Sequence, residues 1–176
     1  MHFTLGEFSS ITSRLAIQRP EVSLRGSDGK IVETVTSDVP DHISIIGDLA
    51  SGAPVTINLR RGQPFKGSPG FFWNIDGELG EIRVTAPSPL FPAFDADVKI
   101  EIYNFANDNV EEVKWQWNDT SLPVAARNVG ALYDQFSFGA KGQYPDFNEA
   151  VKRHREIEAV SKSSDEGQSI DLDMGK

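Results

Sequence analysis

Cysteine is absent from this 176-residue chain, which excludes disulfide bonds, thiol catalysis and zinc–thiolate sites. No apolar run approaches the roughly 20 residues that a membrane-spanning helix requires. Basic residues are too few to balance the acidic ones, so the net charge is −9. This charge disfavours nucleic acid and anionic membrane surfaces, because both are bound through Lys and Arg. Met1–Gly6 lacks the pattern of a signal peptide, so we expect an intracellular protein, cytoplasmic or nuclear.

Short motifs of common enzyme chemistry are also missing. The chain contains no phosphate-binding loop, no H-E-x-x-H helix and no G-x-S-x-G elbow. Two segments, Gly26–Gly29 and Gly77–Gly80, come closest to the G-x-G-x-x-G motif that binds dinucleotides. Because both lie between alternating strands and open no helix, we interpret them as hairpin turns. The sequence predicts no catalytic residue, no metal and no cofactor in this chain.

What the chain does contain is a repeated alternation of apolar and polar residues, which is typical of strands with one buried face. Turn residues such as Gly and Asn separate the alternating segments. We expect about eight mostly antiparallel strands, with turns at Asp28-Gly29, Ser51-Gly52, Asp76-Gly77 and Asn107–Asn109. The clearest strand segments are Ser9–Gln18, His42–Leu49, Pro54–Arg61, Phe71–Ile75, Glu81–Thr85, Val98–Ile102 and Glu112–Trp117.

Two helices are expected after the strands. The first spans Val124–Phe138 and places Ala125, Val129, Leu132, Tyr133 and Phe136 on one face. The second begins at the capping residue Asp146, with Glu149 completing a capping-box pattern, and ends near Gly167. Its predicted apolar stripe consists of Phe147, Ala150, Val151, His154 and Ile157.

These elements predict an α+β fold, an open twisted antiparallel sheet with helices packed on one face. One domain spans residues 1–167, and 168–176 form a polar tail with a short strand at Ser169–Leu172. The other face of the sheet is polar, and we expect it to pair two copies of the chain as a homodimer.

Few side chains are candidates for chemistry. His154 lies on an apolar helical stripe, which favours a packed core imidazole. Asp41 and His42 are neighbours at a strand start, so we expect them to point to opposite faces and to form no proton-handling pair. Asp95 and Asp97 lack a third ligand for a metal ion. Three tryptophans are expected in the core or at a subunit interface: Trp73, Trp115 and Trp117.

The strongest candidate for binding is the loop 60–70. Arg60, Arg61 and Lys66 gather three positive charges in an otherwise acidic chain, among three glycines and two prolines. Clustered cations bind carboxylates and phosphates, and loops between rigid strands often carry function. The alternative is a solvated hairpin loop whose charges serve solubility. We predict a ligand or protein-partner site at these three residues.

Several segments resemble one family in order and spacing, from about Leu5 to Gly167. They are Leu5-Gly6-Glu7, Gln18-Arg19-Pro20, Val39–Ile43, Gly77–Ile82, Pro145-Asp146-Phe147, Ala150-Val151 and His154-Arg155. Together they resemble the C-terminal domain of the glucose–fructose oxidoreductase / inositol dehydrogenase (Gfo/Idh/MocA) family, and most closely its fungal Gal80-like branch.

This resemblance implies an open sheet with helices on one face, whose free face serves dimerisation and whose edge borders a ligand cleft. It also implies that NAD(P) would bind a nucleotide-binding (Rossmann) domain that is absent from this chain. The family's catalytic Lys lies in an E-K-P motif, which does not occur here. Its Asp and His lie on a helix whose last turn would contain Met1, and His2 is too close to Glu7 to match that histidine.

Three functions therefore remain open. The chain is a non-catalytic or truncated substrate-binding and dimerisation domain, half of an NAD(P)-dependent sugar or polyol oxidoreductase, or a regulatory module of the galactose-repressor type. In each case we expect it to be inactive as an enzyme on its own.

Overall fold

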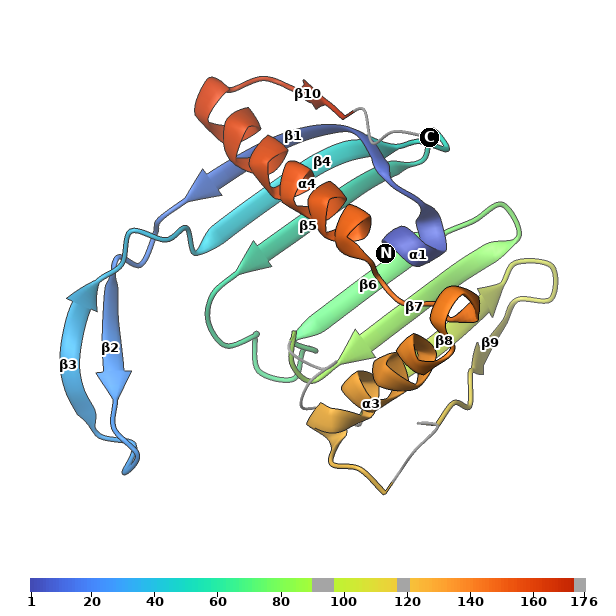
Figure 1. Ribbon diagram of the computed structural model, residues 1–176, viewed down its shortest axis with the longest axis horizontal. Helices are drawn as coiled ribbons and strands as arrows, with labels where there is room; N and C mark the ends of the chain where they lie inside the picture. Colours follow the sequence, from blue (N-terminus) through green and yellow to red (C-terminus); the bar gives the residue numbers. More distant parts are fainter. Residues whose placement is uncertain (90–96, 117–120, 173–176) are drawn as a thin grey trace. The chain divides into compact units, whose positions relative to one another are not determined.

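The computed structural model describes residues 1–89, 97–116 and 121–172 (Figure 1). The chain forms two compact units, Met1–Gly62 with Pro145–Lys176, and Gln63–Tyr144. The described residues contain ten strands, paired antiparallel in three sheets. The predicted α+β class is therefore confirmed. The strands are two more than expected, and they do not form a single sheet.

The first unit is built on a four-stranded sheet in the order β10-β1-β4-β5 (Figure 1). Its strands are β1 (Phe8–Ala16), β4 (His42–Leu49), β5 (Pro54–Arg60) and β10 (Ile170–Asp171). Strands β4 and β5 pair from His42↔Arg60 to Asp48↔Pro54, across the predicted turn at Ser51-Gly52. The short strand predicted near the C-terminus is β10, which pairs with Ser10 and Ile11 of β1.

Helix α4 (Phe147–Glu166) lies across this sheet and packs mainly on β1 (Figure 1). Asp146 caps it as predicted, because its carboxylate accepts hydrogen bonds from Asn148 N and Glu149 N. It ends at Gly167, whose φ of 67° is a left-handed conformation that favours glycine. The core beneath consists of Phe8, Ile11 and Leu49, with Val160 of α4 packed against it.

The face that α4 buries differs from the predicted one. Ala159 and Ser163 are its buried residues, whereas Phe147, Val151 and Ile157 are 91%, 48% and 63% exposed. His154 is also exposed, so its prediction as a core imidazole is wrong. The physical reason is that small side chains let the helix approach β1 closely, and the apolar stripe lies elsewhere on the helix surface.

The outer edge of β1 is completed by serines of α4. Ser163 is fully buried, and its Oγ accepts a hydrogen bond from Ser13 N at 2.8 Å and donates to Gln168 O at 2.6 Å. Ser164 Oγ accepts from Leu15 N at 2.9 Å. Strand β10 pairs with only two residues of β1, so these hydroxyls replace a longer partner strand.

Strands β2 (Glu21–Arg25) and β3 (Ile31–Thr36) form a separate two-stranded ribbon that extends from this sheet (Figure 1). The turn between them is the predicted Asp28-Gly29, where Asp28 Oδ1 accepts from Lys30 N and Gly29 has a φ of 77°. Gly26–Gly29 is therefore a hairpin turn, as the missing helix context indicated.

The second unit is built on a four-stranded meander in the order β6-β7-β8-β9. Its strands are β6 (Phe71–Asp76), β7 (Gly80–Ala86), β8 (Lys99–Asn104) and β9 (Asn109–Glu112). Rows such as Trp73↔Val84↔Ile100 lie on one face, and rows such as Asn74↔Arg83↔Glu101 lie on the other. The predicted alternation is confirmed here, and Gly77–Gly80 is the β6–β7 turn.

The end of this unit departs from the prediction. Strand β9 stops at Glu112, and residues 113–116 have no regular structure, although Trp115 Nε1 donates to Val98 O at 2.9 Å. Trp117 lies outside the described residues. Helix α3 (Val124–Ser137) matches its predicted range and is followed by the 3₁₀ helix η1 (Gly139–Lys141). Its apolar residues Val129, Leu132, Tyr133 and Phe136 are exposed.

Candidate functional site

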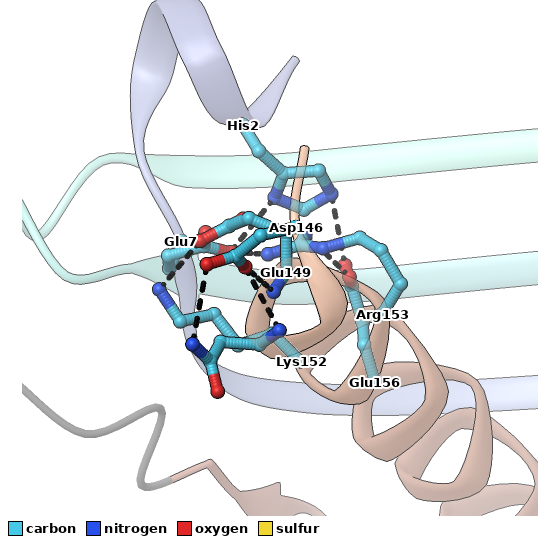
Figure 2. A network of polar contacts seen from close by, with 8 residues as sticks. His2, Glu7, Asp146, Glu149, Lys152, Arg153 and Glu156 are labelled. Carbon is cyan, nitrogen blue, oxygen red and sulfur yellow. Dashed lines mark hydrogen bonds and ion pairs between the residues drawn. The ribbon is translucent and has the colours of Figure 1, made fainter. Parts of the chain in front are cut away.

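An ion-pair cluster joins the start of the chain to α4 within the first unit (Figure 2). Helix α1 (His2–Leu5) places the His2 imidazole between two carboxylates: Nδ1 lies 3.1 Å from Glu7 and Nε2 lies 3.3 Å from Glu156. Nδ1 is buried, and its geometry with Glu7 makes an ion contact without a hydrogen bond. Arg153 donates to both Glu7 and Glu156, and so closes the cluster.

The pKa values of the two carboxyl groups in this α1–α4 cluster are shifted in opposite directions. Burial would raise the pKa of Glu7, but the hydrogen bond and charge of Arg153 outweigh it and hold that pKa below its usual value. Burial raises the pKa of Glu156, and the charge of Glu7 adds to the rise, although His2 and Arg153 oppose it. The charged groups of this cluster thus form ion pairs between two elements that are far apart in sequence.

Sequence reasoning missed this cluster. Arg153 and Glu156 are three residues apart, so they lie on one helix face and form an ion pair at 2.8 Å. That spacing was readable from the sequence, whereas their contact with Glu7, 146 residues away, was not. The cluster anchors α1 on α4. Within the described part of the chain, no group of three or more His, Cys, Asp or Glu side chains could hold a metal ion.

A second cluster surrounds Asp41, just before β4. Its side chain is 1% exposed, and its oxygens accept from Gln18 N at 2.9 Å and from Arg19 N at 2.7 Å. His42 Nδ1 lies 2.7 Å from Oδ1, and Arg61 Nη2 lies 3.7 Å from Oδ2. The hydrogen bond from Gln18 N and that from His42, against the effect of burial, lower the pKa of Asp41 to about 2.

The Asp41–His42 contact corrects the expectation that these neighbours point apart. Strand β4 begins at His42, and Asp41 lies in the bend before it, so strand alternation does not apply to the pair. The imidazole orients the buried carboxylate together with backbone N–H groups, which is a structural arrangement of this corner of the sheet.

The residues of the predicted binding loop belong to both compact units. Arg60 ends β5, and Arg61 follows it in the first unit, while Lys66 belongs to the second unit. Arg61 Nη2 donates to Arg19 O at 2.7 Å, and Arg19 Nη1 donates to Arg61 O at 2.6 Å. The structure therefore joins Arg61 with Arg19 and Asp41, two residues that the sequence did not connect to this loop.

Among the remaining predicted positions, Asp97 is exposed and Asp95 lies outside the described residues. No helix in the described part of the chain has both the length and the apolar character needed to span a membrane.

The polar face of the β6–β9 sheet is a further candidate surface. A row of side chains crosses all four strands, Asn74–Arg83–Glu101–Glu112, according to the register. Arg83 lies over the Phe72 ring, with Cζ 5.5 Å from the ring centroid, and donates to Asn74 at 3.3 Å. Lys99 bridges Glu101 at 2.7 Å and Glu112 at 3.7 Å. Phe72 is 56% exposed on this face.

Comparison with known proteins supports the resemblance seen in the sequence. Residues 1–86 match the family described as Gal80p, C-terminal domain. A dehydrogenase of Aspergillus oryzae, aclE, is 27% identical over 170 residues, which are 96% of this chain and 44% of that protein. The chain thus spans less than half the length of this curated relative.

Solved structures share the fold. The super-repressor mutant of Gal80p from Saccharomyces cerevisiae superposes with a TM-score of 0.74 at 20% identity, over 93% of this chain and 44% of that one. An NAD-binding oxidoreductase from Klebsiella pneumoniae gives 0.70 at 17% identity, over 97% of this chain and 47% of that one. Residues 1–86, just under half of the chain, are therefore similar to the Gal80p C-terminal domain, and the described fold is shared with Gal80p and with an NAD-binding oxidoreductase.

Proposed function

We propose that this chain acts as the sheet domain of a Gal80-like, oxidoreductase-family protein. In this role it pairs two copies through the polar face of the β6–β9 sheet and supplies one wall of a ligand site, without catalysis of its own. The cytoplasm or nucleus is its proposed location.

The observation that carries the pairing proposal is the composition of the β6–β9 face. It combines an exposed aromatic ring, Phe72, with alternating positive and negative side chains on neighbouring strands. Such a surface is self-complementary when two copies meet about a two-fold axis, because each cation of one copy can face a carboxylate of the other. Phe72 would contribute the apolar contact that interfaces place near their centre.

This proposal predicts a dimer in solution, measured by light scattering on the full chain across a concentration series. Phe72→Asp would bury an unpaired charge in the interface and should raise the dimer dissociation constant by about 30-fold or more. The matched control is Leu79→Asp, since Leu79 is 81% exposed in the β6–β7 turn, away from the strand rows. A wild-type chain that stays monomeric at high concentration would refute the pairing role.

The anchoring of α1 supports a non-catalytic role. His2 is held between Glu7 and Glu156, and His42 is held by Asp41, so both imidazoles serve to join elements. We infer that Arg153 fixes the segment after α1 to α4 through its contact with Glu7.

Two other functions keep specific support. The relative named a dehydrogenase favours an enzyme half, whose redox chemistry would need a nucleotide-binding domain. The match to Gal80p, a transcriptional regulator in Kluyveromyces lactis, favours a regulatory module. The coding DNA upstream of Met1 distinguishes the first from a freestanding module: an in-frame segment with G-x-G-x-x-G and E-K-P motifs would establish the enzyme half and exclude the module.

A further inference from the structure

Three arginines and a histidine converge at one end of the β4–β5 pair, in the first unit. His42 and Arg60 are directly opposite each other across the strands, so their side chains share a sheet face. Arg61 follows on the chain, and Arg19 reaches it from the segment after β1 through the reciprocal contacts described above.

Gly62 shows how closely the guanidinium groups approach. It has a φ of 127°, and a methyl group at this position would overlap Nη1 of Arg19 and lie 3.5 Å from Nη1 of Arg60. The glycine therefore leaves room for the Arg19 guanidinium beside the backbone, with that of Arg60 near the same point. Arg61 is the neighbouring residue.

Arg19 and Arg61 carry two positive charges, against the single negative charge of the Asp41 carboxylate that they contact. Asp41 contributes one carboxylate, but its oxygens already accept from Gln18 N, Arg19 N and His42. Like charges held close together repel each other, so an anion bound beside Arg19 and Arg61 would be favourable.

Donors also remain for a ligand. Each guanidinium carries five N–H groups. Contacts from the described residues engage Nη1 of Arg19 and Nη2 of Arg61, so other donors of both groups are left for solvent or an anion. His42 turns Nδ1 to Asp41, and its side chain is 35% exposed. Arginine forks match the geometry of phosphate and carboxylate oxygens and bind them in pairs.

We propose that Arg19, Arg60 and Arg61, together with His42, form a binding site for an oxyanion, the phosphate or carboxylate group of a small molecule. Asp41 is the positioning residue: it holds the Arg19 backbone and the His42 ring in place. The site includes Arg60 and Arg61 of the predicted loop, together with Arg19 and His42, and it does not include Lys66. It is independent of dimerisation and of the proposed domain role.

The test is a titration of the full chain with inorganic phosphate, followed by backbone amide chemical shifts at pH 7 and constant ionic strength. We expect saturable shifts at Arg61 and Gly62. Arg60→Gln should weaken the binding about tenfold, the cost of one charged hydrogen-bonding group. Arg60 is outside the Asp41 contacts described above, so the variant leaves that network intact.

Arg155→Gln is the control, because it removes the same charge from an exposed position on α4. A parallel titration with acetate separates the two ligand sources, and saturable binding of either anion supports the site. Absence of saturable shifts with both anions would overturn the proposal. Equal weakening of binding by Arg60→Gln and Arg155→Gln would also overturn it, since it would indicate general charge attraction. Binding that is unchanged in Arg60→Gln would overturn it as well.

Discussion

Asp41 illustrates how a single residue organises a corner of the fold. Its buried carboxylate accepts hydrogen bonds from two backbone N–H groups of the chain segment that leaves β1, and it contacts His42 at the start of β4. A carboxylate that receives several donors is stabilised in its charged form, which is why its pKa falls. The residue therefore links the ends of two strands through its negative charge.

This arrangement predicts a specific acid sensitivity. The pKa of Asp41 is about 2 in the folded chain, against an ordinary value of 3.8. Since the folded-state pKa is the lower one, the carboxylate stabilises the fold fully above about pH 4, and this contribution is lost as pH falls towards 2. Asp41→Asn should lower the thermal unfolding temperature at pH 7, and the difference from wild type should shrink between pH 4 and pH 2.

Asp38→Asn provides the comparison, because Asp38 is exposed in the same segment. Melting curves followed by circular dichroism at several pH values suffice. A difference between wild type and Asp41→Asn that stays constant down to pH 2 would show that the carboxylate's charge is not what stabilises this corner.

At the scale of elements, the contact between α4 and β1 depends on hydrogen bonds as much as on apolar packing. The face of α4 that meets the strand carries Ala159, Val160, Ser163 and Ser164, and its serines satisfy the edge of β1 beyond the short strand β10. An edge strand with unsatisfied N–H groups buried under a helix would be costly.

Ser163→Ala removes the acceptor of Ser13 N and leaves this N–H group unsatisfied beneath the helix. We expect the free energy of unfolding to fall by about 1–3 kcal/mol, the usual cost of a buried donor without a partner. Urea denaturation measures it. Ser161→Ala is the matched control on the exposed side of α4 and should change stability by less than about 0.5 kcal/mol. Similar effects of the two variants would mean that the hydroxyl of Ser163 is dispensable.

At the scale of the whole molecule, the chain matches 44% of the length of the dehydrogenase relative and 47% of the NAD-binding oxidoreductase that shares its fold. The sequence contains no G-x-G-x-x-G segment between a strand and a helix, the motif that brings backbone close to a pyrophosphate. We therefore expect that the purified chain binds neither NAD(H) nor NADP(H).

Fluorescence titration, which can use Trp73 and Trp115 as intrinsic reporters, measures this directly, and no saturable change is expected up to millimolar nucleotide. Micromolar saturable binding would contradict the prediction that cofactor binding requires a separate nucleotide-binding domain. A binding constant unchanged in Arg60→Gln would further show that such binding does not use the oxyanion site.

Much of the fold was predictable because the signals are local. Alternation located β1, β4 and β5 in one four-stranded sheet and β6, β7 and β8 in the other, and Gly or Asp residues marked turns between them. Asp146 and Gly167 marked the ends of α4, since a cap and a left-handed residue act within one helical turn. The strand predicted at Glu112–Trp117 was wrong, because β9 is Asn109–Glu112 and the alternation of Val113 and Trp115 lies beyond its end.

The candidate sites were predictable only in part. Arg60 and Arg61 stood out as clustered charges, but their connection to Arg19 depends on strands β1, β4 and β5 lying side by side. The α1–α4 cluster likewise joins Glu7 to Arg153 across most of the chain. The helix face was mistaken because Ser163 and Ala159 carry little hydrophobic signal, although close approach to β1 requires small residues.

The sequence by itself determined the class of the fold, the family to which the chain is similar, and the absence of cysteine chemistry. These depend on residue type and on spacing within a few positions. Tertiary structure alone decided which charges meet, such as His2 with Glu156 and Asp41 with Arg61, and which side chain lies beside Gly62, that of Arg19. Electrostatic contacts form over a few ångströms of space, and only the folded chain brings those side chains within that range.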